Sequence, residues 1–364
     1  MDAVVIERGE TAPTIRDVAR PEPEPDEALV RTVRVGIDGT DEEVIDGTHG
    51  GYPDGDDYMI LGHEVVGVVE TAPDGSDLDP GDAVVATVRR PIPGTESEYF
   101  ERGEPDMAPP EECLERGIAG AHGFMSEYFT SPVETLVELP RELLPWGFLV
   151  EPISVSEKAL ELAAASRSAF DWRPESAFVL GNGSLGLLTL AMLDERGYER
   201  LYCMGRRSRP DPSIDVIESL GATYVDSRET PLAEFSAVHE PVDLVYEATG
   251  YARHGIESTQ ALAPNGVAAL LGLPSSHEFE VDGGAIHKDL VMHNKALVGS
   301  VNANRRHFEA AVETLAALPE WLLSDLVTSV TDLESYRDAF AARSDDDGVI
   351  KTAIEFSDPD AGRE

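Results

Sequence analysis

Three glycines in the middle of the chain have the spacing of a dinucleotide-binding turn. Gly181, Gly183 and Gly186 form the pattern G-x-G-x-x-G between an apolar run and a helical one. Such glycines permit a tight turn, let the backbone approach a pyrophosphate and allow close helix–strand packing. The helix then offers free N–H groups to the phosphate. The pattern predicts a dinucleotide site, with an ordinary glycine turn as the alternative. The site includes the residues between the glycines, Asn182, Ser184 and Leu185.

The strand after this turn indicates which dinucleotide is bound. An NAD site usually has an acidic residue about 20 positions further on, which holds the ribose 2′-hydroxyl. Here the predicted strand 201–204 runs into Gly205, Arg206 and Arg207, with Arg209 nearby. Because forked arginine donors can grip a 2′-phosphate, we expect NADP as the main cofactor and NAD as a secondary one. A surface basic cluster paired with acids is the alternative.

Asp38, His63 and Glu151 are candidate metal ligands. His63 precedes a predicted strand in Gly-His-Glu, Asp38 begins Asp-Gly-Thr-Asp, and Glu151 begins Glu-Pro-Ile-Ser. Carboxylates and an imidazole together suit a divalent cation with oxygen and nitrogen ligands. Their spacing in the sequence does not by itself show that these three residues meet in space. Taken singly, His63 reads as a core histidine and Asp38 as a turn residue.

The charge of the chain excludes several kinds of partner. Lys and Arg number 28 against 70 Asp and Glu, which gives a formal net charge of −42, and the acids are spread over the whole length. Such a surface repels nucleic acid and anionic membranes. It also destabilises the compact state by self-repulsion unless salt screens it, so we infer a protein built for molar salt in a halophilic cytoplasm.

The composition is that of a globular chain, because 41% of the residues are hydrophobic. The N-terminus has no basic region followed by an apolar run, so no signal peptide is predicted. No apolar stretch approaches the roughly 18 residues that a spanning helix needs. Cys113 and Cys203 are too few for a disulfide framework. We therefore expect a cytoplasmic protein without a membrane partner.

The pattern of elements changes near Glu151. Short β segments broken by Gly and Pro come first and predict a barrel-like domain. Strands and helices then alternate, which predicts a parallel, doubly wound sheet. The acidic stretch Asp345–Asp347 reads as a solvated loop. The expected strands include 28–35, 64–70, 83–88, 177–180, 201–204, 243–248, 267–273, 296–299 and 349–356, and the expected helices include 154–168, 185–193, 215–220 and 306–317.

Over essentially its whole length the chain resembles the zinc-dependent medium-chain alcohol dehydrogenases, and within them the glucose dehydrogenases of halophilic archaea. The motifs that carry this resemblance are the segments 35–41, 61–64, 115–118, 151–154, 180–186 and 298–302. It implies an α/β protein with a GroES-like catalytic domain (1–152 and 300–364) and an NADP-binding Rossmann domain (153–299). It also implies oxidation of D-glucose, and of other aldoses, at C1 to the 1,5-lactone with hydride transfer to NADP⁺.

The resemblance assigns roles around one catalytic zinc. Asp38 stands where the family usually has a cysteine ligand, and His63 matches the histidine ligand. Glu64 matches a neighbouring glutamate that is an outer group or an occasional ligand. Glu151 matches a glutamate at the metal, bound directly or through water. Thr40 would hydrogen-bond the reacting oxygen of the sugar and relay its proton outward, and Glu151 would accept the sugar's proton through a metal-bound water. A carboxylate is a harder ligand than a thiolate in the hard–soft sense, so Mn²⁺ and Mg²⁺ are alternatives to zinc.

Further roles follow for the substrate and the nicotinamide. The resemblance implies that Thr40, Glu115, Glu151 and Asn302 contact the sugar. Asp41 and Glu42 are additional candidates, and His122 reads as a structural or cleft-lining residue. The nicotinamide pocket is formed by Gly272, Leu273, Pro274, Ser300, Val301 and Asn302.

One departure from the family concerns a second metal. Many relatives hold a structural zinc with four cysteines in the lobe near residues 90–117, whereas Cys113 is the one cysteine there. A closed four-cysteine site is thereby excluded, and we predict no structural zinc. The rival functions are a dehydrogenase of polyols, other aldoses or simple alcohols, a zinc-free quinone reductase, and a non-catalytic NADP-binding relative. The family also implies a homo-oligomer, a dimer or a tetramer.

Overall fold

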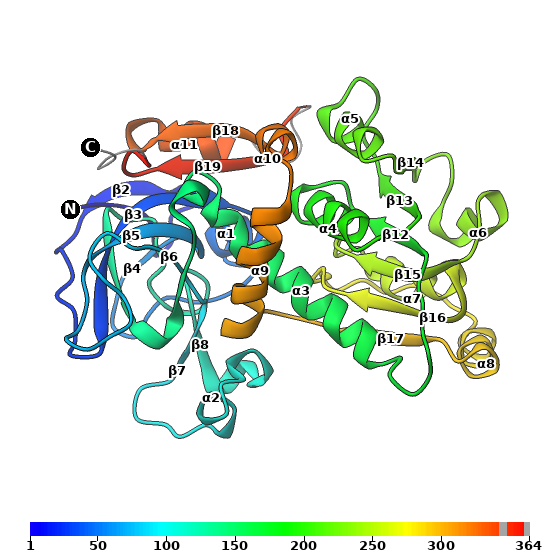
Figure 1. The fold of residues 1–364 in the computed structure, drawn as a ribbon, viewed down its shortest axis with the longest axis horizontal. Helices are drawn as coiled ribbons and strands as arrows, with labels where there is room; N and C mark the ends of the chain where they lie inside the picture. Colours follow the sequence, from blue (N-terminus) through cyan, green and yellow to red (C-terminus); the bar gives the residue numbers. More distant parts are fainter. Residues whose placement is uncertain (342–347, 360–364) are drawn as a thin grey trace. The chain divides into compact units, whose positions relative to one another are not determined.

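Short valine-rich strands build the first of two units into which the chain divides (Figure 1). The computed structural model describes residues 1–341 and 348–359, and the predicted loop Asp345–Asp347 lies outside them. The first unit comprises Met1–Ser154, Asn302–Ala317 and the chain from Val327, and the second comprises Val155–Val301 and Leu318–Leu326.

The first unit is mainly antiparallel sheet. Its strands are β1 (Asp2–Glu7), β2 (Thr14–Asp17), β3 (Glu27–Ile37), β4 (Tyr58–Ile60), β5 (Glu64–Thr71), β6 (Ala83–Ala86), β7 (Arg89–Pro91), β8 (Cys113–Arg116), β9 (Gly120–Ala121), β10 (Tyr128–Pro132), β11 (Leu136–Glu138), β18 (Val327–Asp332) and β19 (Lys351–Glu355). Its helices are α1 (Gly39–Ile45), α2 (Glu98–Glu101), α9 (Arg305–Ala317), α11 (Tyr336–Ala341) and the start of α3 (Val150–Ala165).

The register of the largest sheet in the first unit positions the candidate site. Its strand order is β11-β6-β5-β3-β19-β18, with β10 also pairing with β3. Gly36 of β3 lies opposite Glu64 of β5, and Ile37 lies opposite Thr352 of β19. Residues that directly follow β3 therefore lie beside the start of β5 and the start of β19.

The second unit has one parallel sheet. Its strands are β12 (Ser176–Leu180), β13 (Arg200–Gly205), β14 (Thr223–Asp226), β15 (Val242–Glu247), β16 (Leu262–Leu270) and β17 (Ala296–Gly299). The other elements are α4 (Ser184–Glu195), α5 (Pro212–Ser219), α6 (Phe235–Val238), α7 (Ala252–Ala261), α8 (Gly283–His293), α10 (Glu320–Leu326) and most of α3. The order β14-β13-β12-β15-β16-β17 is that of a doubly wound sheet, with its switch point between β12 and β15.

The two sheets confirm the predicted fold class. The central strand β12 is buried along its whole length, as expected for a parallel strand covered on both faces. The expected strand 267–273 was misplaced, because β16 begins at Leu262 and ends at Leu270, and the expected helix at 154 begins earlier, at Val150. Strand β14 and the helices α7 and α8 were not predicted. None of the helices that the structure describes combines the length and apolar character needed to cross a membrane.

Candidate active site

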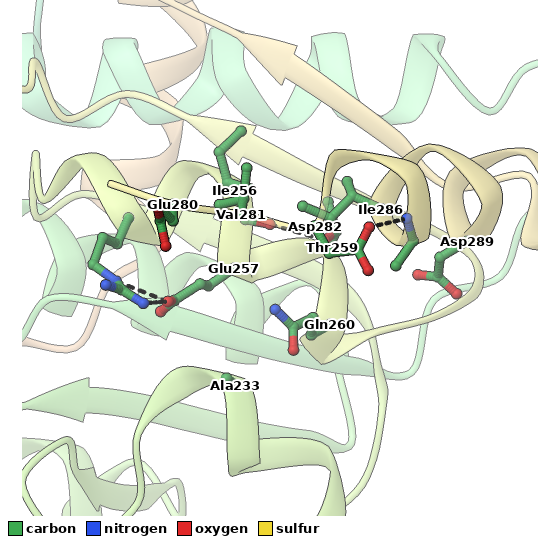
Figure 2. Close-up of a pocket in the computed structure, with 12 residues that line it drawn as sticks. Ala233, Ile256, Glu257, Thr259, Gln260, Glu280, Val281, Asp282, Ile286 and Asp289 are labelled. Atoms are coloured by element: carbon green, nitrogen blue, oxygen red, sulfur yellow. Dashed lines mark hydrogen bonds and ion pairs between the residues drawn. The ribbon is translucent and has the colours of Figure 1, made fainter. Parts of the chain in front are cut away.

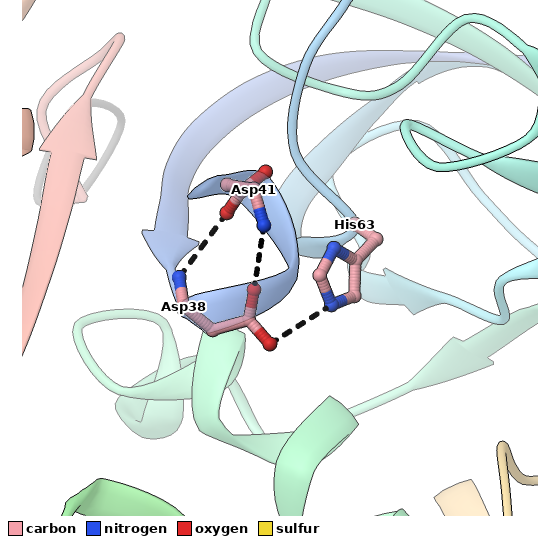
Figure 3. A group of neighbouring side chains, drawn as sticks. All are labelled: Asp38, Asp41 and His63. Atoms are coloured by element: carbon pink, nitrogen blue, oxygen red, sulfur yellow. Dashed lines mark hydrogen bonds and ion pairs between the residues drawn. The ribbon is translucent and has the colours of Figure 1, made fainter. Parts of the chain in front are cut away.

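Asp38 follows β3 and caps the helix α1. Its Oδ1 accepts hydrogen bonds from the backbone N–H of Thr40 at 2.9 Å and of Asp41 at 3.1 Å. Aspartate is among the preferred N-cap residues because its carboxylate satisfies N–H groups that the first turn leaves without partners. The second oxygen, Oδ2, accepts a hydrogen bond from the Thr40 hydroxyl at 3.1 Å and lies 3.5 Å from His63 Nε2. The cap thus holds one carboxylate oxygen and directs the other at the histidine (Figure 3).

His63 is the meeting point of the predicted ligands. One ligand atom each of Asp38, Asp41 and His63 lies within 4.8 Å of the others, and the same holds for His63, Glu64 and Glu151. Glu151 reaches this group from the first turn of α3 and is buried. The structure therefore brings together the four residues predicted as metal ligands, Asp38, His63, Glu64 and Glu151.

Asp41 links the segment that carries Asp38 to the segment that carries His63. It is fully buried, and its Oδ2 accepts a hydrogen bond from the backbone N–H of Asp38 while its Oδ1 accepts one from Gly62, each at 3.1 Å. Both oxygens are therefore engaged with the backbone next to Asp38 and His63, and Figure 3 shows the contact with the Asp38 backbone. The suggestion that Asp41 contacts the sugar finds no support in this geometry.

Glu64 has a cationic partner that the sequence reasoning missed. Lys351, the first residue of β19, donates a hydrogen bond from Nζ to Glu64 Oε1 at 2.6 Å and another to the carbonyl of Ile37 at 3.0 Å. Both side chains are almost completely buried. Glycine is required opposite, because a Cβ on Gly36 would lie 2.0 Å from Glu64 Oε2. The sequence feature that could have revealed this pair was a lysine at the start of the C-terminal strand β19.

Burial and crowding shift the pKa values of the four carboxyl groups and the imidazole. Burial, with Asp38 as neighbour, raises the pKa of Asp41 to about 7, and burial with the nearby Glu64 and Asp38 raises that of Glu151 to about 8. Burial also raises the pKa of Glu64, although Lys351 opposes this. Burial would lower the pKa of His63 and raise that of Asp38, but their mutual attraction reverses both shifts.

This donor set fits a divalent cation. Four carboxyl groups converge on one imidazole, and Lys351 contacts only Glu64 among them, so the cluster carries more negative than positive charge when the acids ionise. His63 Nδ1 is also buried without a hydrogen-bond partner among the described residues. Buried charges of one sign are costly unless they are paired or coordinate a metal, and oxygen with nitrogen ligands suits zinc or manganese.

Glu115 and Asn302, the predicted sugar contacts, touch each other. They are 187 residues apart in sequence, yet Asn302 Nδ2 donates a hydrogen bond to Glu115 Oε1 at 3.0 Å. Arg89 donates to the same oxygen at 3.0 Å and was not predicted as part of the site. Arg89, Glu115 and Asn302 thus form one hydrogen-bonded group.

The glycine turn of the second unit has the predicted form. Gly181 follows β12 and Ser184 begins α4, so the glycines join a strand to a helix. A Cβ on Gly186 would lie 1.9 Å from the Gly181 carbonyl oxygen, which explains why glycine is needed where the helix crosses the strand end. Asn182 donates a hydrogen bond from Nδ2 to the Ser213 hydroxyl at 2.7 Å. The turn has the geometry of a pyrophosphate site.

The three arginines after β13 have different partners. Arg207 donates a hydrogen bond to Asp211 at 3.1 Å, and Arg209 donates one to Glu218 at 2.9 Å. Arg206 is exposed and donates no hydrogen bond to any residue that the structure describes. The alternative of a basic cluster paired with acids thus holds for Arg207 and Arg209, whereas Arg206 attracts Asp226 without a hydrogen bond.

The predicted nicotinamide residues gather at one edge of the parallel sheet. Gly272, Leu273 and Pro274 follow β16, and Ser300 and Val301 follow β17. These are carboxyl ends of parallel strands, as is the glycine turn after β12, so the residues share the edge where such sheets bind ligands. The Ser300 hydroxyl is buried and has no hydrogen-bond partner among the described residues. Asn302 groups with the first unit instead.

A pocket of about 440 Å³ lies elsewhere in the second unit, between α7 and α8. Figure 2 shows Glu257 and Gln260 of α7 facing Asp282, which caps α8, and Ile286 of α8. None of the residues predicted for the cofactor, metal or sugar lines it. His122 is a structural residue, since its Nδ1 accepts a hydrogen bond from the Ile60 N–H and its ring stacks on Tyr58.

Comparison with known proteins confirms the resemblance described above. Residues 24–141 match the alcohol dehydrogenase GroES-like domain, and residues 144–356 match the family described as glucose dehydrogenase C-terminus. Glucose 1-dehydrogenase 1 of Haloterrigena turkmenica is 64% identical over an alignment of 364 positions that covers 98% of this chain and 100% of that protein. Glucose 1-dehydrogenase of Haloferax mediterranei is 62% identical over 359 residues, 98% of this chain and 99% of that one.

A solved structure extends the likeness to the fold. Haloferax mediterranei glucose dehydrogenase in complex with NADP, Zn and gluconolactone is 61% identical, with a TM-score of 0.95 over 98% of this chain and 100% of that chain. The family match covers more than half of the chain, and the relatives match nearly all of it. The chain therefore belongs to the glucose dehydrogenase family, in which an alcohol dehydrogenase GroES-like domain precedes the glucose dehydrogenase C-terminal region.

Proposed function

We propose that this chain is a zinc-dependent glucose 1-dehydrogenase that oxidises D-glucose at C1 to the 1,5-lactone and transfers the hydride to NADP⁺. The observation that carries the proposal is the convergence of Asp38, His63 and Glu151 in a chain 64% identical to a glucose 1-dehydrogenase. The relative with NADP, Zn and gluconolactone supports the same cofactor, metal and product here. NAD⁺ serves as a secondary acceptor.

The residues of the first unit have separate tasks in this reaction. Asp38, His63 and Glu151 would hold the zinc, with Glu64 beside them and kept in place by Lys351. Zinc, when bound, supplies a Lewis acid that stabilises the alkoxide of the sugar. Thr40, whose hydroxyl now contacts Asp38 Oδ2, hydrogen-bonds the reacting oxygen of the sugar. Glu151 accepts the proton, and Glu115 with Asn302 binds sugar hydroxyls.

The nucleotide-binding domain, which we propose to be residues 153–299, binds the dinucleotide. The turn 181–186 holds the pyrophosphate, and Gly205 with Arg206 and Arg207 surrounds the 2′-phosphate. Residues 272–274, which follow β16, and residues 300 and 301, which follow β17, line the nicotinamide. The protein's contribution is to orient the two reactants and exclude water, since the hydride chemistry belongs to the cofactor.

A substrate panel before and after chelation tests the proposal. NADPH formation is measured in molar KCl with glucose, galactose, xylose and sorbitol. We expect the highest kcat/KM with glucose, a loss of more than about tenfold after chelator treatment, and recovery with Zn²⁺. A preference for sorbitol would favour the polyol dehydrogenase instead. No turnover of any of the four, with NADPH binding intact, would favour a non-catalytic relative.

Arg206 is expected to decide between NADP and NAD. In Arg206→Ser the KM for NADP⁺ should rise about 10- to 100-fold, because a charge-assisted contact to phosphate is lost, while the KM for NAD⁺ changes little. Arg209→Ser is the matched control, since this arginine is already paired with Glu218, and it should leave both constants nearly unchanged. Equal effects of the two substitutions on NADP⁺ would contradict the assignment.

We also propose a homodimer formed through β17 and α8. Strand β17 is the last strand of its sheet and pairs only with β16 among the described residues, and Val291 and Met292 of α8 are 63% and 66% exposed. An open edge beside exposed apolar side chains favours pairing with a second copy. Sedimentation in molar KCl should show a dimer, which Met292→Asp weakens and the control Val238→Asp on α6 does not. A monomeric parent chain would refute this.

We infer the cellular compartment of the protein from its net charge. A surface with a net charge of −42 suits a halophilic cytoplasm, where salt screens the repulsion between the acids.

A further inference from the structure

Arg89 is a buried arginine in the lobe that carries Glu115. It lies on β7 directly opposite Glu115 of β8, so the two form a cross-strand pair. Its Nε donates a hydrogen bond to Glu115 Oε1 at 3.0 Å. A second guanidinium nitrogen donates to the carbonyls of Ala108 at 2.8 Å and Pro105 at 3.2 Å. The side chain is only 3% exposed, so the guanidinium is fixed by protein groups rather than by water.

Asn302 fixes the same carboxylate from another part of the chain. Its Nδ2 donates a hydrogen bond to Glu115 Oε1, while its Oδ1 accepts one from the backbone N–H of Ala303 at 2.9 Å. The amide orientation is therefore set at both ends. Asn302 also has a φ of 59°, a left-handed conformation that few residues other than glycine and asparagine adopt readily.

The two donors act on one oxygen and leave the other available. Both hydrogen bonds to the Glu115 carboxylate end on Oε1, and no donor among residues 1–341 and 348–359 donates to Oε2. The side chain is 16% exposed, so a ligand can reach it. A carboxylate held at one oxygen presents the lone pairs of the second in a fixed direction, which suits hydroxyl groups of a bound sugar.

We propose that Arg89 is a positioning residue for sugar recognition, which holds the Glu115 carboxylate so that Oε2 accepts hydrogen bonds from substrate hydroxyls. This rests on the proposed glucose dehydrogenase function. Because Arg89 acts through Glu115, its loss weakens binding of the sugar and leaves the binding of NADP⁺ and zinc unaffected. Arg89 also donates hydrogen bonds to the carbonyls of Pro105 and Ala108, contacts that a residue with a purely structural role would make. The experiment below distinguishes this structural role from the positioning role.

The test is a double-mutant cycle on the full chain loaded with zinc, in molar KCl. Arg89→Met, Glu115→Gln and the double variant are assayed for kcat and for KM with glucose, and titration calorimetry measures gluconolactone binding in the presence of NADPH. We expect Arg89→Met to raise the KM for glucose about 10- to 100-fold with a smaller change in kcat. We expect the double variant to match Glu115→Gln, because both substitutions remove one shared interaction.

Arg31→Met is the matched control. Arg31 also donates a hydrogen bond from Nε to a glutamate oxygen, Glu70 Oε1, at 3.0 Å in the same unit. Its loss should leave the KM for glucose unchanged. If Arg89→Met does not fold, Arg89→Lys carries the test, since it keeps a charge and a donor and should raise the KM about three- to tenfold.

Three outcomes would overturn the proposal. One is an unchanged KM in Arg89→Met, or in Arg89→Lys where that variant carries the test. Another is a double variant in which the two effects multiply, since Arg89 would then act independently of Glu115. The third is an effect confined to stability, with normal gluconolactone affinity in the folded fraction. A parent chain that oxidises no sugar refutes the proposed function and the inference together, whereas normal glucose turnover with any of these three outcomes refutes the inference alone.

Discussion

Asp38→Ala is expected to lower glucose turnover by more than about a thousandfold, because it removes a proposed metal ligand. The same substitution removes the N-cap of α1, which costs only about 1 kcal/mol of stability and cannot account for such a loss. Asp38→Asn keeps a capping oxygen but not the charge, so it should retain stability and still bind zinc weakly. Metal content of the purified chains and NADPH formation measure the effect.

Asp332→Ala provides the control for the Asp38 experiment. Asp332 also caps a helical turn in the first unit, by accepting a hydrogen bond from the Ser335 N–H at 2.8 Å, and it contacts none of the clustered ligands. Its loss should leave zinc content and turnover unchanged. Full zinc occupancy in Asp38→Ala, or equal losses in the two variants, would show that Asp38 serves only as a cap.

The second large effect is expected on stability, from breaking the buried pair of Lys351 and Glu64. Lys351→Met leaves the Glu64 carboxylate buried without its cation, and loss of one member of such a pair typically costs about 3 to 5 kcal/mol. This is a large part of the roughly 5 to 15 kcal/mol that separates folded from unfolded domains. Urea unfolding in molar KCl, on chelated protein so that metal binding adds no stability, measures the loss.

A second substitution separates the lost charge pair from lost packing. Lys351→Met with Glu64→Gln should be more stable than Lys351→Met alone, because no unpaired charge is then buried. Arg102→Met breaks the exposed pair of Arg102 with Glu98 and should cost at most about 0.5 kcal/mol. If Lys351→Met costs no more than this surface substitution, the pair contributes little and Glu64 must find another partner.

Several strands of the parallel sheet could be predicted closely from sequence. Buried parallel strands are continuous apolar runs, so β12, β13 and β17 were placed to within one residue at each end. The turn at Gly181 and Gly186 is a local backbone requirement visible as spacing. Helices on the outside of this sheet were harder to predict. Helix α8 has no fully buried residue, and it was missed because its sequence combines the partly buried Ile286 and Leu290 with the exposed Val291 and Met292, so no single apolar face marks it.

The fold class, the strand–turn–helix of the dinucleotide site and the residue types that could bind a metal and a sugar could all be inferred from the amino-acid sequence. Which of these residues meet depends on long-range packing. The pairing of β3 with β5 and β19 brings Asp38, His63 and Lys351 together, and the contact of Glu115 with Asn302 spans 187 residues. Periodicities and caps act over a few neighbouring residues and leave a local trace, whereas strand register depends on packing across the whole unit.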